Sequence, residues 1–226
     1  MTNRPEGALA VLCDFDGTIT VDETLGFLYE RFAGPECQDL VQGWIRGELT
    51  TPQEMRGCFA SMKATRAELE AALQGVRVDP GFPGLVQFCR HQGYQLAILS
   101  DGLMWYIRLI LDREGFPDLP VFANEILFLT QGVEIRSPWY DPETPRRGVS
   151  KPAIIRKYQA EGYRVVFVGD GLSDVEAVGV ADRVCARGQL LDYCQERGFP
   201  AIGFSRLGDL LEKWGSGPNA TMSGGG

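Results

Sequence analysis

The sequence predicts an α/β protein with a doubly wound, mostly parallel sheet and a helical cap inserted after the first strand. Three observations predict this fold class. A continuous apolar run, residues 8–15, stands near the start of the chain, and residues 20–75 then carry helical spacing without a strand. From there to residue 214, helical and strand patterns alternate, which is typical of a parallel sheet with helices on both faces.

The first strand is predicted from ALAVLCDF, residues 8–15. The run is short, bounded and continuously apolar, as expected of a strand that is buried on both faces. It ends in two carboxylates, Asp14 and Asp16, and an unpaired carboxylate in an apolar setting is costly. A turn, a cation or a substrate is therefore expected to compensate these charges.

The helical insert is predicted to contain three or four helices. A threonine followed three residues later by a glutamate matches a capping box, and Pro52 stands where a first helical residue would. The predicted boxes are Thr20 with Glu23, Thr51 with Glu54 and Thr65 with Glu68. We expect a core made of residues 1–19 and 78–214, and a cap made of residues 20–77.

After the cap, the chain is expected to alternate between helix and strand. Two strands flank a turn at Gln131-Gly132, and a last helix ends near residue 214. The tail, residues 215–226, is predicted to be disordered because it is rich in glycine and small polar residues.

Composition excludes several classes of protein. The sequence has no run of eighteen apolar residues, so a membrane span is not expected, and no secretory signal is visible. The net charge of −8 argues against nucleic acid as a partner. The six cysteines form no CxxC pair and there is one histidine, His91, so zinc and disulfide frameworks are not expected. We expect a cytoplasmic protein, monomeric or homodimeric.

Polar groups follow three of the predicted strands, and a lysine stands before a predicted helix. They are Asp14-Phe15-Asp16-Gly17-Thr18, Ser100-Asp101-Gly102, the segment from Gly169 to Asp174, and Lys151. Parallel topology brings strand ends to one edge of a sheet, where ligands bind. Carboxylates suit a hard cation such as Mg²⁺, and lysine, serine and glycine-rich turns suit phosphate. An aspartate can also attack phosphorus, and Asp14 leads the set as that nucleophile.

The segments DFDGT, LSDG and GDGLSD, with Lys151, resemble the four ordered motifs of the haloacid dehalogenase superfamily of phosphatases. The resemblance covers residues 9–214 and implies the Rossmann-like core of that superfamily. The helical insert resembles the cap of the phosphoserine-phosphatase-like branch. Within that branch, residues 181–212 are similar to the methionine-salvage phosphatases that act on 2-hydroxy-3-keto-5-methylthiopentenyl-1-phosphate.

The resemblance implies roles for the matching residues. Asp14 is the implied nucleophile, and Asp16 is the implied general acid and base. The implied phosphate-binding residues are Ser100, Asp101, Gly102 and Lys151. The implied Mg²⁺ ligands are Asp14, the backbone carbonyl of Asp16, and Asp170. Asp174 is implied either to bind the ion through water or to orient Lys151. Those enzymes usually have Ser-Gly-Gly-Phe where this chain has Ser-Asp-Gly-Leu, which argues against phosphoserine as the substrate.

Some residues keep two interpretations. Glu23 matches a substrate-contacting glutamate of phosphoserine phosphatases, but it also completes the Thr20 capping box. Arg56 either binds a substrate anion or faces solvent. Trp105 and Tyr106 are expected to belong to the core rather than to a substrate wall.

The sequence thus predicts a Mg²⁺-dependent hydrolase of a small phosphorylated metabolite that forms an aspartyl-phosphate. Alternatives are phosphoserine or another metabolite as substrate, and phosphotransfer to an acceptor other than water. A non-catalytic binding protein would be expected to lose Asp14 or Asp16. A receiver-type signalling domain lacks the Asp-x-Asp-Gly-Thr element. The sequence does not determine the leaving group.

Overall fold

The computed structural model describes residues 8–214, and a sheet with the strand order β4-β3-β2-β1-β5-β6-β7 forms its centre. Neighbouring strands are parallel except β3 and β4, which are antiparallel. The strands are β1 (Leu9–Cys13), β2 (Gln95–Leu103), β3 (Val121–Phe128), β4 (Val133–Arg136), β5 (Arg164–Gly169), β6 (Arg183–Ala186) and β7 (Ile202–Gly203). The mostly parallel sheet confirms the predicted fold class.

Strand β1 lies in the middle of the sheet, between β2 and β5, and every residue of it is buried. Its side chains alternate between two hydrophobic cores: Leu9, Val11 and Cys13 face one, and Ala10 and Leu12 face the other. This alternation explains why the strand is apolar throughout, because neither of its faces meets water.

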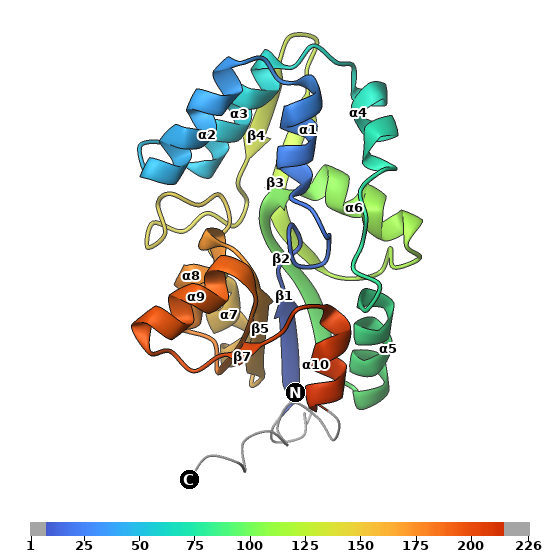
Figure 1. Ribbon diagram of the computed structural model, residues 1–226, viewed down its shortest axis with the longest axis vertical. Helices are drawn as coiled ribbons and strands as arrows, with labels where there is room; N and C mark the ends of the chain where they lie inside the picture. Colours follow the sequence, from blue (N-terminus) through green and yellow to red (C-terminus); the bar gives the residue numbers. More distant parts are fainter. Residues whose placement is uncertain (1–7, 215–226) are drawn as a thin grey trace.

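Helices cover both faces of the sheet (Figure 1). One core contains side chains of α5 (Phe82–Gln92), α6 (Met104–Arg113) and α10 (Leu207–Trp214). The other contains side chains of α7 (Lys151–Ala160), α8 (Val175–Val178) and α9 (Gly188–Arg197). The short 3₁₀ helix η1 (Leu172–Asp174) precedes α8. The fold is therefore doubly wound, as predicted.

The insert after β1 forms four helices at the end of the molecule where β3 and β4 extend past the other strands, and α3 packs against β4 (Figure 1). They are α1 (Thr24–Phe32), α2 (Glu36–Arg46), α3 (Thr51–Ser61) and α4 (Arg66–Leu73). The two ends of the insert meet in an isolated antiparallel bridge between Thr20 and Val78. The insert thus leaves and rejoins the core at one place, although its exact division from the core stays a prediction.

The first of the three predicted capping boxes is wrong. Helix α1 begins at Thr24, with Glu23 as an N-cap that makes no side-chain hydrogen bond. The hydroxyl of Thr20 donates instead to the Asp22 carbonyl (2.8 Å) and accepts from the Gly17 N–H (3.2 Å). It therefore serves the loop after β1, so capping no longer explains Glu23.

The other two predicted boxes differ in outcome. The box of α4 between Thr65 and Glu68 is confirmed. The predicted box of α3 is wrong by one residue, because Thr50 and Gln53 form it in place of Thr51 and Glu54. The hydroxyl of Thr51 bonds elsewhere, to Asp101 of the core.

The expectation of no disulfide is also wrong. Cys37 of α2 and Cys58 of α3 form a disulfide bond within the cap. The two cysteines are 21 residues apart, and only the packing of the two helices brings them together. The predicted cytoplasmic location rested in part on the absence of disulfides. It loses that support and stays a prediction.

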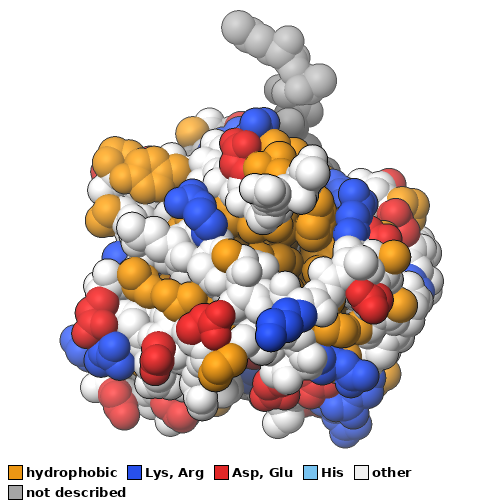
Figure 2. All heavy atoms as spheres, turned by 90° about the horizontal axis from the view of Figure 1, so that it is seen from above, with side chains coloured by type: hydrophobic (Ala, Val, Ile, Leu, Met, Phe, Trp, Pro, Cys, Tyr) orange, Lys and Arg blue, Asp and Glu red, His pale blue; other side chains and the backbone are white. Residues whose placement is uncertain are grey.

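The cap end of the molecule carries charges of both signs. Figure 2 shows this face from above, with Lys and Arg interspersed with Asp and Glu around a hollow that has hydrophobic side chains in it. A mixed surface of this kind does not form the broad basic patch that nucleic acid requires. Within residues 8–214, no helix combines the length and the apolar character that crossing a membrane requires. The predicted tail, residues 215–226, lies outside the described residues.

Candidate active site

The loop after β1 is a tight turn that places Asp14 and Asp16 at the carboxyl edge of the sheet. The Phe15 carbonyl accepts hydrogen bonds from the N–H groups of Ile19 (2.8 Å) and Thr20 (2.9 Å). Gly17 has a φ of 75°, which favours glycine, and a Cβ there would stand 2.5 Å from a carboxylate oxygen of Asp170. The glycine of the first motif is therefore needed both for its conformation and for space.

The predicted nucleophile, Asp14, is buried beside Lys151. The Lys151 Nζ lies 2.6 Å from Asp14 Oδ1 and also donates to Asp174 Oδ1. Burial alone lowers the pKa of Lys151, but its two carboxylate partners outweigh burial and raise that pKa, so the lysine stays charged. The other oxygen of Asp174 accepts the N–H groups of Asp170 (2.9 Å) and Gly171 (3.0 Å). Asp174 is thus arranged to orient Lys151.

Three carboxylates gather at the strand ends. Asp14, Asp170 and Asp174 each offer an oxygen, and these oxygens lie within 4.8 Å of one another. Burial and the neighbouring Asp174 raise the pKa of Asp14 well above its usual range, and the same two causes raise that of Asp170 to about 6. One lysine does not balance this negative charge. The cluster therefore suits a hard divalent cation with oxygen ligands.

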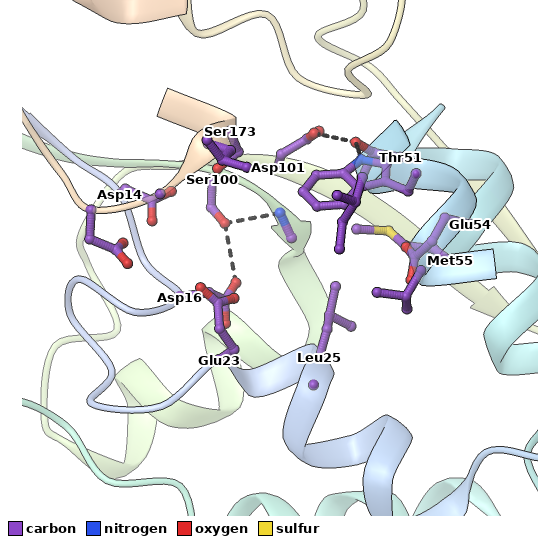
Figure 3. Close-up of a pocket in the computed structure, with 18 of the residues that line it drawn as sticks. Asp14, Asp16, Glu23, Leu25, Thr51, Glu54, Met55, Ser100, Asp101 and Ser173 are labelled. Atoms are coloured by element: carbon purple, nitrogen blue, oxygen red, sulfur yellow. Dashed lines mark hydrogen bonds between the residues drawn. The ribbon is translucent and has the colours of Figure 1, made fainter. Parts of the chain in front are cut away.

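The carboxylate of Asp16 points away from this cluster and toward the cap. Its Oδ1 accepts the Thr24 N–H (3.2 Å), and its Oδ2 accepts the hydroxyls of Ser100 (3.5 Å) and Tyr106. Burial raises the pKa of Asp16, although the bonds from Thr24 and Tyr106 oppose this effect. Figure 3 shows Asp16 and Ser100 facing one another and joined by this hydrogen bond. A buried, oriented carboxyl group of this kind can hold a proton.

Tyr106 is a site residue that the sequence interpretation assigned only to the core. Its ring is fully buried, as predicted, but its hydroxyl reaches Asp16. A Cβ at position 102 would collide with that hydroxyl, so Gly102 leaves the room for this hydrogen bond. The signal in the sequence was weak: Tyr106 stands four residues after Gly102, on the first turn of α6.

A cavity of about 520 Å³ lies between these strand ends and the cap. Its cap side is formed by Glu23, Leu25, Tyr29, Val41, Trp44, Ile45, Glu54 and Met55. Glu23 is exposed as a residue, but desolvation of its carboxyl group in the cavity and the charge of Asp16 raise its pKa to about 8, and burial raises the pKa of Glu54 to about 7. Among the described residues that line this cavity there is no lysine or arginine.

The structure brings most of the predicted site residues to this cavity. Glu23 lines it beside Asp16, and Ser100, Asp101 and Gly102 line it from β2 (Figure 3). Arg56 does not line it, and its side chain is exposed on α3. The carboxylate of Asp101 hydrogen bonds to the cap and to a neighbouring loop, so that side chain is already engaged.

A doubly wound sheet with buried aspartates and a serine at adjacent strand ends, a lysine from α7 beside them and an inserted helical cap can hold a phosphoryl group and a divalent cation for hydrolysis. The chain belongs to the haloacid dehalogenase-like hydrolase family, whose model matches residues 11–178.

Curated relatives agree with this assignment. The chain is 27% identical over 207 residues to a protein of Brevibacillus brevis named 2-hydroxy-3-keto-5-methylthiopentenyl-1-phosphate phosphatase, with 90% of this chain and 93% of the relative covered. A protein of the same name from Geobacillus kaustophilus is 30% identical over 211 residues, with 90% and 94% covered.

Solved structures share the fold. A phosphoserine phosphatase carrying a phospho-aspartyl intermediate analogue has a TM-score of 0.69 at 22% identity, and the alignment covers 92% of this chain and 99% of that one. A hydrolase of the same family from Salmonella enterica has a TM-score of 0.70 at 18% identity, covering 92% and 71%.

Proposed function

We propose that this phosphatase hydrolyses a small phosphomonoester through an aspartyl-phosphate on Asp14, with Mg²⁺, and that its substrate is 2-hydroxy-3-keto-5-methylthiopentenyl-1-phosphate. The observation that carries the reaction type is the contact between the buried carboxylate of Asp14, which lines the cavity, and Lys151, which lies behind it. The cap side of that cavity and the named relatives support the substrate.

In the first step, Asp14 attacks the phosphorus atom and Asp16 gives a proton to the departing oxygen. Lys151 and Ser100 hold the transferring phosphoryl oxygens. Asp174 keeps Lys151 in place, because it bonds to the lysine and to two backbone N–H groups. The product of this step is the aspartyl-phosphate and a neutral alcohol.

In the second step, water attacks the aspartyl-phosphate and Asp16 accepts its proton. The tyrosine hydroxyl of Tyr106 and the N–H of Thr24 hold the carboxyl group of Asp16 in position for both transfers. Phosphatases of this family generally use Mg²⁺, and the proximity of the Asp14 and Asp170 carboxylates supports these two as ligands. When bound, the ion neutralises charge so that carboxylate and phosphate can approach one another.

Removal of the metal is expected to abolish turnover. We expect EDTA to stop hydrolysis of p-nitrophenyl phosphate, Mg²⁺ to restore it and Ca²⁺ to restore it poorly, because the looser shell of Ca²⁺ positions the attack less well. Asp170→Ala should raise the Mg²⁺ concentration that gives half-maximal rate. Asp118→Ala, which removes an exposed partner of Arg90, is the control and should leave it unchanged. Full activity in a chelated sample would refute the metal site.

The lining of the cavity favours an uncharged leaving group with an apolar part. A leaving group that carried a carboxylate, such as serine, would face Glu23 and Glu54 without a lysine or arginine to pair with. Leaving such a charge unpaired in a partly desolvated pocket is costly. Leu25, Val41 and Met55 instead offer an apolar surface, which suits the methylthio end of the proposed substrate.

A phosphate-release screen tests the substrate. The panel contains the methylthiopentenyl phosphate, phosphoserine, phosphocholine and sugar phosphates, and kcat/KM is compared across it. We expect the methylthiopentenyl phosphate to give the highest value and phosphoserine a much lower one. Phosphoserine as the fastest substrate would refute the proposal. Added alcohols that lower the yield of free phosphate would indicate phosphotransfer.

A cationic leaving group is the second candidate, because Glu23 and Glu54 lie in a cavity that also contains Tyr29 and Trp44. Carboxylates and aromatic faces both attract quaternary ammonium groups. The variant Glu54→Gln separates the two candidates at pH 8.5, where the carboxylate with a pKa of about 7 is charged. If the leaving group is neutral, as we propose, kcat/KM should change less than about fivefold. A loss of more than about tenfold, the size of a close charge–charge interaction of about 1.4 kcal/mol, would favour the cation.

A further inference from the structure

The carboxylate of Asp101 joins three parts of the chain that are distant in sequence. Its Oδ1 accepts the N–H groups of Gly148 (2.9 Å) and Val149 (2.9 Å), which stand just before the helix that carries Lys151, and the side-chain amide of Asn124 (3.2 Å). Its Oδ2 accepts the hydroxyl of Thr51, at 2.6 Å, from the first residue of the cap helix α3. Asp101 thus connects the second motif, the loop after β4 and the cap.

The hydrogen bonding continues from Thr51 to the wall of the cavity. The same hydroxyl that donates to Asp101 accepts the indole N–H of Trp44 (3.1 Å). The N–H of Thr51 donates to the Arg146 carbonyl (2.9 Å), and Arg146 donates in turn to the Trp44 carbonyl. Trp44, Thr51 and Asp101 all line the cavity. Figure 3 shows the hydrogen bond between Thr51 and Asp101 at its wall.

These contacts fit a positioning role better than phosphate binding. Both oxygens of Asp101 already accept hydrogen bonds, and a carboxylate repels a phosphate. A glycine at this position, as in the Ser-Gly-Gly motif that this segment departs from, would have no side chain to reach Thr51. The carboxylate is therefore the feature that attaches the cap wall to the core.

We propose that Asp101, acting through Thr51, is a positioning residue that holds Trp44 as the wall for the leaving group and so sets the substrate preference of this phosphatase. The inference rests on the proposed function in requiring a leaving group that reaches the cap. Binding of the phosphoryl group does not depend on the position of Trp44, because Lys151 and Ser100 stand on the core side. The hydrogen bonds predict that losing the Thr51 hydroxyl loosens the wall without disabling the chemistry.

The test uses two alkyl phosphates of different length, n-pentyl phosphate and methyl phosphate. Thr51→Val removes the hydroxyl and keeps the shape, and Thr51→Ser keeps the hydroxyl. We expect Thr51→Val to lower the pentyl-to-methyl ratio of kcat/KM by about tenfold, which is the size of a lost charge-assisted hydrogen bond. The change should come from a higher KM for pentyl phosphate. Thr51→Ser should retain the ratio.

Thr50→Val is the matched control. Thr50 caps the same helix, so its loss weakens α3 without touching Asp101, and the ratio should be unchanged. Equal losses for both phosphates in Thr51→Val, or the same change of ratio in Thr50→Val, would mean that Thr51 is merely structural and would overturn the inference.

A readout without turnover tests the hydrogen bonds directly. The indole N–H signal of Trp44, one of four tryptophans, is identified by its loss in Trp44→Phe. We expect its hydrogen exchange to be slow in the wild type and about tenfold faster in Thr51→Val and in Asp101→Asn. Unchanged exchange in both variants would overturn the inference. Wild-type enzyme that does not prefer pentyl phosphate would instead refute the proposed apolar leaving group.

Discussion

Replacement of Asp14 by asparagine is expected to lower turnover of every phosphomonoester by about 10³-fold or more, because the amide cannot attack phosphorus. The side chain keeps its shape, and Lys151 keeps its second partner, Asp174, so the fold should survive. Steady-state rates with p-nitrophenyl phosphate measure the loss, and a thermal unfolding curve shows whether the variant is folded.

Asp22→Asn is the matched control for this experiment. Asp22 stands on the same segment of the chain but is half-exposed and pairs with Arg77, and an exposed ion pair contributes about 0–1 kcal/mol. Its activity should stay within about twofold of the wild type. If folded Asp14→Asn retains more than about a tenth of the activity, a barrier change below about 1.4 kcal/mol, Asp14 is not the nucleophile.

The sheet could be predicted because its signals are local. A strand buried on both faces, such as β1, must be apolar at every position. The turn between β3 and β4 has glycine, Gly132, at the position whose φ is positive, which is the residue type that such a turn favours. Helix starts were harder to predict. Moving the start of α3 by one residue changes which threonine caps the helix: Thr50 caps it, and the hydroxyl of Thr51 bonds to Asp101 instead.

The meeting of strand ends could also be anticipated, since parallel strands point their carboxyl ends to one edge. That topology brings Asp14 to Lys151 across 137 residues. Contacts made by single side chains from the cap and from α6 could not be anticipated. Tyr106 reaches Asp16 from the first turn of α6, and Cys37 meets Cys58 only through the packing of α2 on α3.

Asp16→Ala is expected to separate the acid from the nucleophile, because the value of a general acid depends on how poor the leaving group is. An alkoxide needs a proton to leave, and p-nitrophenolate scarcely does. Formation of the phosphoenzyme should therefore slow by about 10²–10⁴ with an alkyl phosphate, the usual size of acid–base catalysis, and much less with p-nitrophenyl phosphate.

The second step responds differently, because water must still lose a proton to attack the aspartyl-phosphate. The variant should therefore accumulate phosphoenzyme with p-nitrophenyl phosphate, seen as a burst of p-nitrophenol followed by slow turnover. A rapid-quench comparison of the two substrates measures both steps. Tyr106→Phe, which removes only the hydroxyl that holds Asp16, should show a smaller effect in the same direction. Equal slowing of the first step for both leaving groups, without a burst, would mean that Asp16 serves the turn or the metal and that another group supplies the proton.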